Sequence, residues 1–391
     1  MNNLPANACA YPFKARMLQH GLPATPCCRF HNRFLSELDK DTVTPFADIQ
    51  ETMLRNEWHD GCYKCKADED AGKASMRTEA DKFFSDFTTG TDLEYLEITV
   101  GRLCNLACIT CGPEFSHTWD DDVLALDIES PDYIKNLRKT QELDLDSLDL
   151  DLLKNLKHLK VTGGEPFLHR QFLRLVVRLA DAGIAENVRI EIFTNCSWYP
   201  GKLEMDALVK FKQIRITTSL DGIGIVNDFI RYPSTWEKIE STLDKWIAVR
   251  DSFGAPYNRK FIVSAAPTVS VLNACYMFEF MHWARVHKQI EVVLQTVYEP
   301  NYLSITHWPA WFKTKLQYTV DAQFEGFNNR YDKLKPAHKL ITKLCATPSS
   351  ELDKGSEYFH EIKRIATHRK QDLRDLKKFW NLINLEARRI A

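Results

Sequence analysis

The middle of the chain alternates between strand-like and helix-like segments, and this alternation restricts the fold more than any other feature. Six short runs rich in β-branched and aliphatic residues are candidate strands, at 94–100, 156–162, 188–194, 214–220, 260–269 and 290–297. Amphipathic helical patterns separate several of them, as at 167–183, 235–251 and 273–288. Strands that alternate with helices predict a parallel sheet with right-handed crossovers. Six units are too few for a complete eight-stranded barrel, so we expect an α/β fold with an open, partial (β/α)6 TIM-like barrel.

The segments before and after this barrel have different sequence patterns from it. The N-terminal part is loop-rich, with helical pieces such as 46–58, and the part after residue 300 reads as helices. We therefore expect a cysteine-rich module at 1–90, the barrel at 91–300 and a helical C-terminal region at 301–391. Asp and Leu alternate over 141–156, which predicts the solvated face of a helix, because a calcium loop needs a glycine at its turn and this stretch has none.

Composition restricts the partners and the compartment. The formal net charge is −2, so no global charge attracts nucleic acid or an anionic membrane. The N-terminus lacks a signal-peptide core, and no run approaches the roughly 18 apolar residues that span a bilayer. We expect a cytoplasmic protein. Eight of the eleven cysteines lie before residue 112, and in a reducing compartment such clustering indicates metal ligation more than disulfides.

Three of these cysteines form a compact motif. Cys104, Cys108 and Cys111 follow the spacing C-x3-C-x2-C, just after the first expected strand. A [4Fe–4S] cluster usually takes four cysteines, so three would leave one iron without a protein ligand. Open coordination positions distinguish catalytic from structural metal sites. The alternative is a zinc site with His117 as its fourth ligand.

The triplet resembles the signature of the radical S-adenosylmethionine (SAM) superfamily, and a second motif agrees with it. Directly after the second expected strand, the chain reads "GGEP", with Gly163, Gly164, Glu165 and Pro166. The resemblance implies that these residues line the methionine amino group of SAM. Glycines let the backbone approach a ligand closely, and a carboxylate accepts charge-assisted hydrogen bonds from an ammonium group.

Weaker parts of the resemblance concern later strand ends. It implies that Ser219 in "SLDG" meets the ribose of SAM and that Arg231 in "FIRY" meets its carboxylate. Asn195, at the end of the third expected strand, could face the SAM pocket or act only as a strand-end cap. One departure is Thr110, because many members have an aromatic residue just before the third cysteine.

A second set of cysteines precedes the barrel. We expect Cys9, Cys27, Cys62 and Cys65 to hold an auxiliary [4Fe–4S] cluster, with Cys28 as a substitute for Cys27. The order resembles the twitch or half-SPASM module of radical SAM enzymes, although that module usually follows the barrel. Structural zinc is the alternative, because C-x2-C pairs bind zinc readily.

The resemblance implies an enzyme that cleaves SAM reductively and removes a hydrogen atom from its substrate. We expect a peptide or protein side chain as substrate and a flavodoxin or ferredoxin as reductant. The alternatives are a small molecule (sugar, amino alcohol or natural-product intermediate), or a non-catalytic iron–sulfur or zinc protein. No catalytic acid or base can be named. No Cys or Tyr is marked by its position as a second hydrogen donor, and Cys196 and Cys275 are candidates for that role only because they lie near strand ends. The segment 356–391 carries nine Lys or Arg against five Asp or Glu, which indicates a solvated helical face or a docking surface for an acidic partner.

Overall fold

Seven of the described strands form a parallel sheet of the partial TIM-like barrel type. The computed structural model describes residues 5–31, 33, 35, 46–80, 83–84, 90, 92–140, 143–254, 260–327, 332–348 and 354–390. The seven-stranded sheet has the order β1-β2-β3-β4-β5-β6-β8, with β1 (Ala15–Gln19), β2 (Tyr95–Thr99), β3 (His158–Thr162), β4 (Arg189–Thr194), β5 (Gln213–Thr218), β6 (Phe261–Ala265) and β8 (Glu291–Val292). A two-stranded sheet pairs β7 (Thr268–Val269) with β9 (Gln295–Thr296). The α/β fold predicted from the alternating pattern is confirmed.

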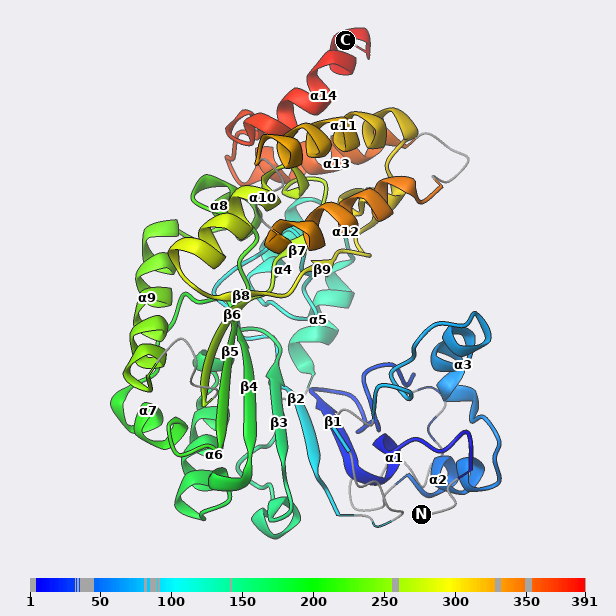
Figure 1. Ribbon diagram of the computed structural model, residues 1–391, viewed down its shortest axis with the longest axis vertical. Helices are drawn as coiled ribbons and strands as arrows, with labels where there is room; N and C mark the ends of the chain where they lie inside the picture. The colour runs from blue at the N-terminus through cyan, green and yellow to red at the C-terminus, as the bar shows by residue number, and fades with distance from the viewer. Residues whose placement is uncertain are drawn as a thin grey trace. The chain divides into compact units, whose positions relative to one another are not determined.

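The first strand was not anticipated from the sequence. The segment "ARMLQ" lacks the β-branched residues that favour strands, yet it pairs in parallel with β2, from Ala15 opposite Tyr95 to Gln19 opposite Thr99 (Figure 1). The N-terminal segment, which we expected to hold only loops and helical pieces, thus supplies a strand of the sheet. The partner strand provides the backbone hydrogen bonds that stabilise it, and local propensity does not show this.

Two other expectations need correction. The stretch 143–149 is not helical, and only the 3-10 turn Leu150–Leu153 precedes β3; residues 141–142 of this expected helix lie outside the described residues. Asp side chains explain the difference, because Asp144 and Asp149 accept hydrogen bonds from backbone N–H groups of residues 147 and 151, and such local bonds compete with helix formation. The expected strand 260–269 is divided into β6 and β7 around Pro267, which has no N–H to donate.

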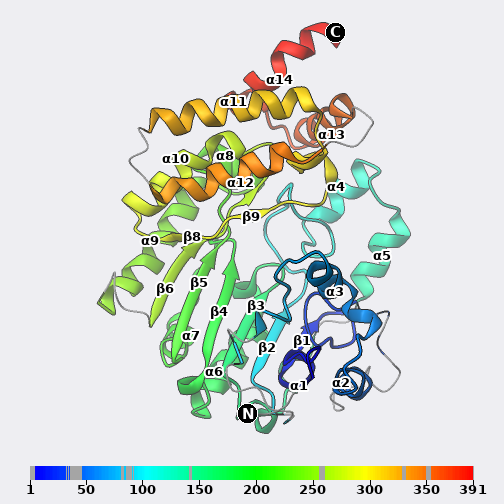
Figure 2. The same ribbon diagram turned by 45° about the vertical axis from the view of Figure 1, so that its right-hand side comes forward.

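The chain divides into two compact units. The first comprises residues 1–101, 139–192 and 200–215. Its helices are α1 (Tyr11–Lys14), α2 (Ala47–Leu54), α3 (Tyr63–Asp70), α6 (Arg170–Asp181) and α7 (Lys202–Leu208). In α6 the apolar positions are buried and arginines separate them, as the sequence pattern predicts. The N-terminal helices α1 and α2 share a core with β1 and β2 (Figure 2), in which Tyr11, Ile49 and Tyr95 are buried together.

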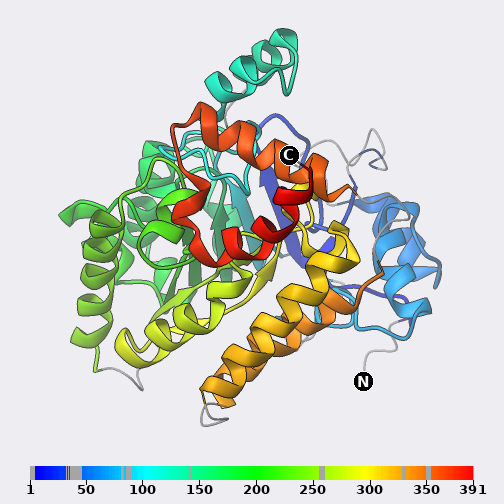
Figure 3. The same ribbon diagram turned by 90° about the horizontal axis from the view of Figure 1, so that it is seen from above.

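The second unit comprises residues 102–138, 193–199 and 216–391. Its helices are α4 (Trp119–Ala125), α5 (Pro131–Lys139), α8 (Ile225–Ile230), α9 (Trp236–Ser252), α10 (Met277–His282), α11 (Ala310–Gly326), α12 (Lys335–Ala346), α13 (Gly355–His368) and α14 (Lys377–Ile390). The helical character expected after residue 300 is therefore present, and Figure 3 shows α11 and α12 lying along one another. Among the described residues, no helix has both the length and the apolar character needed to cross a bilayer.

Candidate functional site

The cysteine triplet lies on the loop between β2 and α4, in the second unit. Cys104 and Cys108 are buried, and Cys111 packs against them. Burial raises the pKa of the Cys108 thiol to about 12, with a smaller opposing effect from Arg231. Burial likewise raises the pKa of Cys111 to about 11. The charges of the three thiols also act on one another, so thiolates packed together here need a compensating cation or metal.

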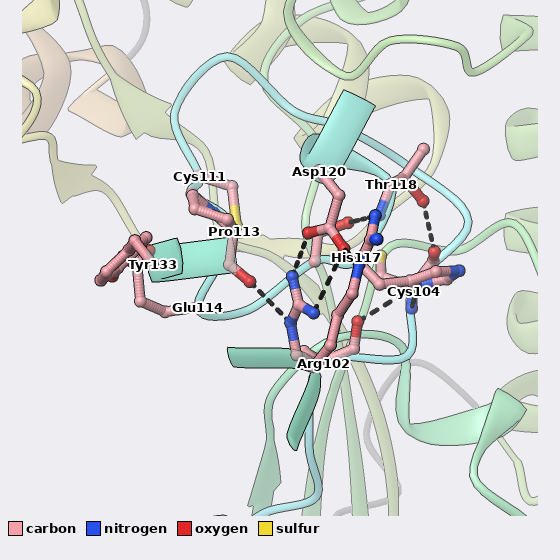
Figure 4. Close-up of polar contacts among 12 residues, drawn as sticks. Arg102, Cys104, Cys111, Pro113, Glu114, His117, Thr118, Asp120 and Tyr133 are labelled. Atoms are coloured by element: carbon pink, nitrogen blue, oxygen red, sulfur yellow. Dashed lines mark hydrogen bonds and ion pairs between the residues drawn. The ribbon is translucent and has the colours of Figure 1, made fainter. Parts of the chain in front are cut away.

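Side chains that immediately follow the triplet hold the loop by its carbonyl groups. The hydroxyl of Thr118 donates to the Cys104 carbonyl at 2.6 Å (Figure 4), and the hydroxyl of Ser116 donates to the Leu106 carbonyl at 2.6 Å. Trp119 donates from Nε1 to the Cys108 carbonyl at 2.9 Å. The carbonyls of both buried cysteines therefore have side-chain donors, which fixes the loop without a regular helix or strand.

The segment that carries Arg231 also supports the loop. The N–H of Ala107 donates to the Tyr232 carbonyl at 2.6 Å, and the N–H of Ile109 donates to the Ile230 carbonyl at 2.8 Å. These two bonds place the end of α8 against the middle of the cysteine loop. They explain how residues far apart in the sequence reach the same site.

His117 is not placed as a metal ligand. Its Nδ1 accepts a hydrogen bond from the N–H of Cys104 at 3.2 Å, and the side chain is exposed. Figure 4 shows the ring beside Arg102 and Cys104. This geometry gives no support to the alternative of a zinc site completed by His117, because the nitrogen nearest the loop already binds the backbone.

Ion pairs and a hydrogen bond hold the two ends of the loop that carries Cys104, Cys108 and Cys111. Arg102 donates from Nε to the Pro113 carbonyl at 2.8 Å and pairs with Asp120 (Figure 4). Asp120 is buried and also accepts from Arg138 Nε at 2.8 Å. Removing one partner of such a buried pair leaves an uncompensated charge, which is strongly destabilising.

A buried cation lies beside the triplet. Arg231 Nη1 is 3.8 Å from the Cys108 sulfur, and its Nη2 is 2.9 Å from Asp221 Oδ2. Burial by itself lowers the pKa of Arg231, but the charges of Asp221 and of the three cysteines outweigh it and raise that pKa. The guanidinium therefore stays charged and compensates thiolates. Its buried Nε makes no hydrogen bond within the described residues, so one donor is available for a ligand.

Asp221 is a site residue that sequence reasoning did not select. It is fully buried, and its carboxylate accepts a 2.7 Å hydrogen bond from the N–H of Thr268. The motif "SLDG" contains it, but the resemblance directed attention to Ser219. In the structure Ser219 is half-buried, and its N–H donates to the Thr194 carbonyl at 2.7 Å. In the sequence, Asp221 is only a single acidic residue at the end of an expected strand. Its role as the partner of Arg231 depends on contacts between residues that no local pattern connects.

Asn195 also contacts the triplet. Its Nδ2 donates to Asn105 Oδ1 at 3.0 Å and lies 3.7 Å from the Cys104 sulfur. Its Oδ1 accepts from the hydroxyl of Ser197 at 2.6 Å. These bonds orient an N–H donor toward a thiolate, an arrangement that in iron–sulfur proteins tunes the reduction potential.

The "GGEP" motif lies at the carboxyl end of β3, in the first unit. Gly163 has φ +121°, and an added Cβ would lie 2.9 Å from the backbone nitrogen of Val100. The N–H of Gly164 donates to the Gly101 carbonyl at 2.8 Å. Glu165 is fully buried, and its carboxylate accepts from the N–H of Phe167 at 3.2 Å, while Pro166 begins a 3-10 turn. Glycine at position 163 is therefore required by close backbone packing against the end of β2.

The N-terminal cysteines gather in the first unit around a small cavity. Cys9, Cys27, Cys62 and Cys65 all line it. Burial raises the pKa of Cys9 and of Cys62 to about 12, and charges of the neighbouring thiols add to both effects. The four cysteines come from the loop before α1, from the loop after β1, from the 3-10 turn Asp60–Cys62 and from α3.

Cys28 is placed differently from its neighbour. Its side chain is exposed, it does not line the cavity, and its sulfur lies 3.7 Å from that of Met76. Burial raises the pKa of its thiol, with the charge of Glu97 adding to the effect. This geometry favours Cys27 over Cys28 as the member of the four-cysteine set.

Arg77 plays the same part in this cavity that Arg231 plays beside the triplet. It lines the cavity and donates from Nη1 to the Ala6 carbonyl at 2.9 Å. The hydrogen bonds that Arg77 donates to the Glu69 carboxylate raise the pKa of Arg77 against the effect of burial, and the charges of Cys9 and Cys65 raise it further. A charged guanidinium beside grouped thiols suits a site whose thiolates carry excess negative charge.

Both cysteine sets have the donor chemistry of iron–sulfur clusters. Clusters are held by thiolates, and hydrogen bonds and nearby charges tune them; the triplet offers three thiols and the N-terminal cavity offers four. Within the described part of the chain, no three His, Cys, Asp or Glu side chains are arranged to hold a single metal ion.

Comparisons with known proteins agree with the triplet and the "GGEP" motif. Residues 98–252 match the Radical SAM superfamily, and this segment contains both motifs. A stretch of 97 residues is 28% identical to the probable GTP 3′,8-cyclase of Sulfurisphaera tokodaii, covering 25% of this chain and 26% of that protein.

Two solved structures are similar at low identity. For anSMEcpe with bound AdoMet, the TM-score is 0.38 and the identity 16%, over 60% of this chain and 61% of the other. For Streptococcus suis SuiB bound to the precursor peptide SuiA, the TM-score is 0.34 and the identity 13%, over 68% of this chain and 60% of the other. This chain thus spans about a quarter of the curated relative and less than two thirds of either solved chain.

Proposed function

We propose that the chain is a radical SAM enzyme, with SAM and a [4Fe–4S] cluster as cofactors, that removes a hydrogen atom from a peptide or protein side chain. The match of residues 98–252 to the Radical SAM superfamily supports this proposal. A [4Fe–4S] cluster reduced by one electron, together with SAM, would supply a 5′-deoxyadenosyl radical for this step, so that the cofactors would carry the difficult chemistry. The observation that carries the proposal is the cysteine triplet, in which Cys104 and Cys108 are buried with Cys111 packed against them and the charged Arg231 lies 3.8 Å from the Cys108 sulfur.

The protein residues then have binding and orienting roles. Cys104, Cys108 and Cys111 ligate three irons of the cluster. Arg231 binds the carboxylate of SAM through its unpartnered Nε, while Asp221 holds the guanidinium in place.

The remaining SAM contacts come from strand ends. The "GGEP" residues bind its amino group, and the buried Glu165 supplies the carboxylate for the ammonium. Ser219 binds the ribose, and Asn195 orients a donor toward Cys104.

We further propose an auxiliary [4Fe–4S] cluster on Cys9, Cys27, Cys62 and Cys65. The shared cavity and the adjacent Arg77 support it, and the order of cysteines resembles the twitch module. These four cysteines would hold all four irons of such a cluster, and the cluster would supply a place for the second electron of a net two-electron oxidation of the substrate. Structural zinc in this cavity is the competing assignment, since four cysteines bind zinc as well.

Two candidate functions differ in the class of substrate that is modified. A peptide or protein side chain follows from the resemblance to twitch-type enzymes. Modification of a small molecule is the second candidate, and the likeness of one segment to a probable GTP 3′,8-cyclase is the observation that favours it. The reductant in either case is a flavodoxin or ferredoxin that delivers single electrons.

The proposal is tested with anaerobically reconstituted protein. We expect about eight irons per chain if both sites hold [4Fe–4S] clusters and about four if the N-terminal site holds zinc. Addition of dithionite and SAM releases 5′-deoxyadenosine, and Cys108→Ala abolishes this release while leaving the N-terminal metal in place. Cys345→Ala is the matched control, because Cys345 lies outside both sets. Iron-replete, reduced protein that forms no 5′-deoxyadenosine would contradict the proposed chemistry.

A further inference from the structure

The C-terminal helices enclose a cavity that the proposed chemistry does not use. Its volume is about 810 Å³, and it lies in the second unit between the start of α11, one side of α13 and α14. Four aromatic side chains line it, namely Trp308, Trp311, Phe359 and Trp380. Trp308 is buried, whereas the other three are half-buried. A cavity of this volume lined by aromatic rings has the size and character of a ligand site. We call it the C-terminal groove.

The rim of the C-terminal groove is cationic. Lys363 and Lys370 line it with exposed side chains, and neither forms an ion pair with a described residue. Arg374 also lines it but is paired with Asp372 at 2.8 Å. Lys363 and Lys370 therefore contribute two uncompensated positive charges to a groove that is also lined by aromatic side chains.

The same segment that lines the groove contacts the cysteine loop. Arg369 lies between groove residues 367 and 370, stacks on the Trp119 ring at 4.4 Å, and pairs with Asp122 at 2.7 Å. Gln371, which lines the groove, donates to the Phe229 carbonyl of α8 at 3.1 Å. Trp119 binds the Cys108 carbonyl, so one short segment connects the groove lining to the loop that carries the triplet.

We propose that the C-terminal groove binds an acidic peptide segment that inserts a large apolar side chain, and that this segment is a docking element of the peptide or protein substrate. The identity of the occupant as substrate rests on the proposed function. Charge complementarity supports the choice, because carboxylates on the segment meet Lys363 and Lys370. Large aromatic side chains in a partly desolvated pocket are the anchors that carry most binding energy at protein surfaces.

The test uses the reconstituted full-length protein and a display library of random peptides. We expect the selected peptides to be enriched in Asp or Glu beside Leu, Phe or Trp. A fluorescein-labelled selected peptide then gives a dissociation constant by fluorescence anisotropy. Trp311→Ala, and separately the double variant Lys363→Glu/Lys370→Glu, weaken this binding by at least about tenfold. Lys339→Glu, a charge reversal on an exposed helical lysine outside the groove, leaves it unchanged.

Several results would overturn the inference. They are a library selection with no acidic and apolar enrichment, binding that Trp311→Ala and the double lysine variant do not affect, and equal binding of a peptide with Lys in place of its acids. Circular dichroism confirms that each variant is folded. Because binding is measured without reductant or turnover, its failure is separate from failure of the proposed chemistry, which is judged by 5′-deoxyadenosine alone. Peptides that bind the groove but are not modified would show that the occupant is not the substrate.

Discussion

Trp119 donates a 2.9 Å hydrogen bond to the carbonyl of Cys108, and Arg369 lies over the same indole ring at 4.4 Å. One tryptophan thus connects a ligand of the proposed catalytic cluster to the segment after α13. The bond to a buried carbonyl matters because an unsatisfied buried acceptor costs about 1–3 kcal/mol. The triplet loop has no regular secondary structure, so it depends on such side-chain donors for its shape.

We expect Trp119→Phe to loosen the triplet site without unfolding the protein. Phenylalanine keeps an aromatic ring under Arg369 but removes the donor to Cys108. The cluster should be lost to a chelator several times faster than in the parent protein, measured by the decay of visible absorbance under anaerobic conditions. Trp198→Phe is the control, because Trp198 is 47% exposed and lies outside the loop. Equal rates for the two variants would contradict the role given to the Trp119 hydrogen bond.

The adjacent residues Cys27 and Cys28 allow a direct test of which cysteine binds metal in the N-terminal cavity. Cys27→Ser removes a thiol that lines the N-terminal cavity, whereas Cys28→Ser removes an exposed thiol outside it. We expect Cys27→Ser to lower the iron content by up to about four atoms per chain and Cys28→Ser to leave it unchanged. Iron and zinc are measured by inductively coupled plasma mass spectrometry. Loss of metal in Cys28→Ser with retention in Cys27→Ser would reverse the assignment.

Gly163 allows a test of the backbone in the "GGEP" motif. Gly163→Ala places a Cβ 2.9 Å from the backbone nitrogen of Val100 at φ +121°, so the end of β3 must shift. We expect SAM affinity to fall by at least about tenfold, as measured by equilibrium dialysis. Gly183→Ala serves as the control, since Gly183 also has positive φ but an added Cβ meets no atom within 4 Å. It should cost about 1 kcal/mol of stability without changing SAM affinity.

The environment of His158 makes the free energy of unfolding depend on pH in the acidic range. Burial, with the nearby positive charges of Arg189 and Lys157, lowers the pKa of His158 from 6.5 to about 4. The folded protein therefore holds this ring neutral while the unfolded chain protonates it, and stability is lost as the pH falls from about 6.5 toward 4. His158→Gln should reduce the slope of unfolding free energy against pH in this range, measured by urea denaturation. His360→Gln, at an exposed position, should leave the slope unchanged.

Much of the fold follows from local sequence pattern. The alternation of strand-like and helical segments predicts the parallel α/β sheet, because periodicity is a property of neighbouring residues and needs no knowledge of distant contacts. The spacing of Cys104, Cys108 and Cys111 is equally local. No local pattern predicts the strand β1, because its stability comes from pairing with β2, about eighty residues away.

The sheet type, the triplet and the presence of a second cysteine set can all be predicted from short stretches of sequence. Which side chains surround the two cysteine sets depends instead on how the chain packs. This packing places Cys27 rather than Cys28 beside the cavity, buries Asp221 against Arg231, and brings Arg369 over Trp119. Short motifs specify ligand chemistry through residues a few positions apart. Charge compensation, hydrogen-bond donors to the loop and the C-terminal groove instead arise when residues separated by up to about 250 positions are packed together, and no local pattern records that packing.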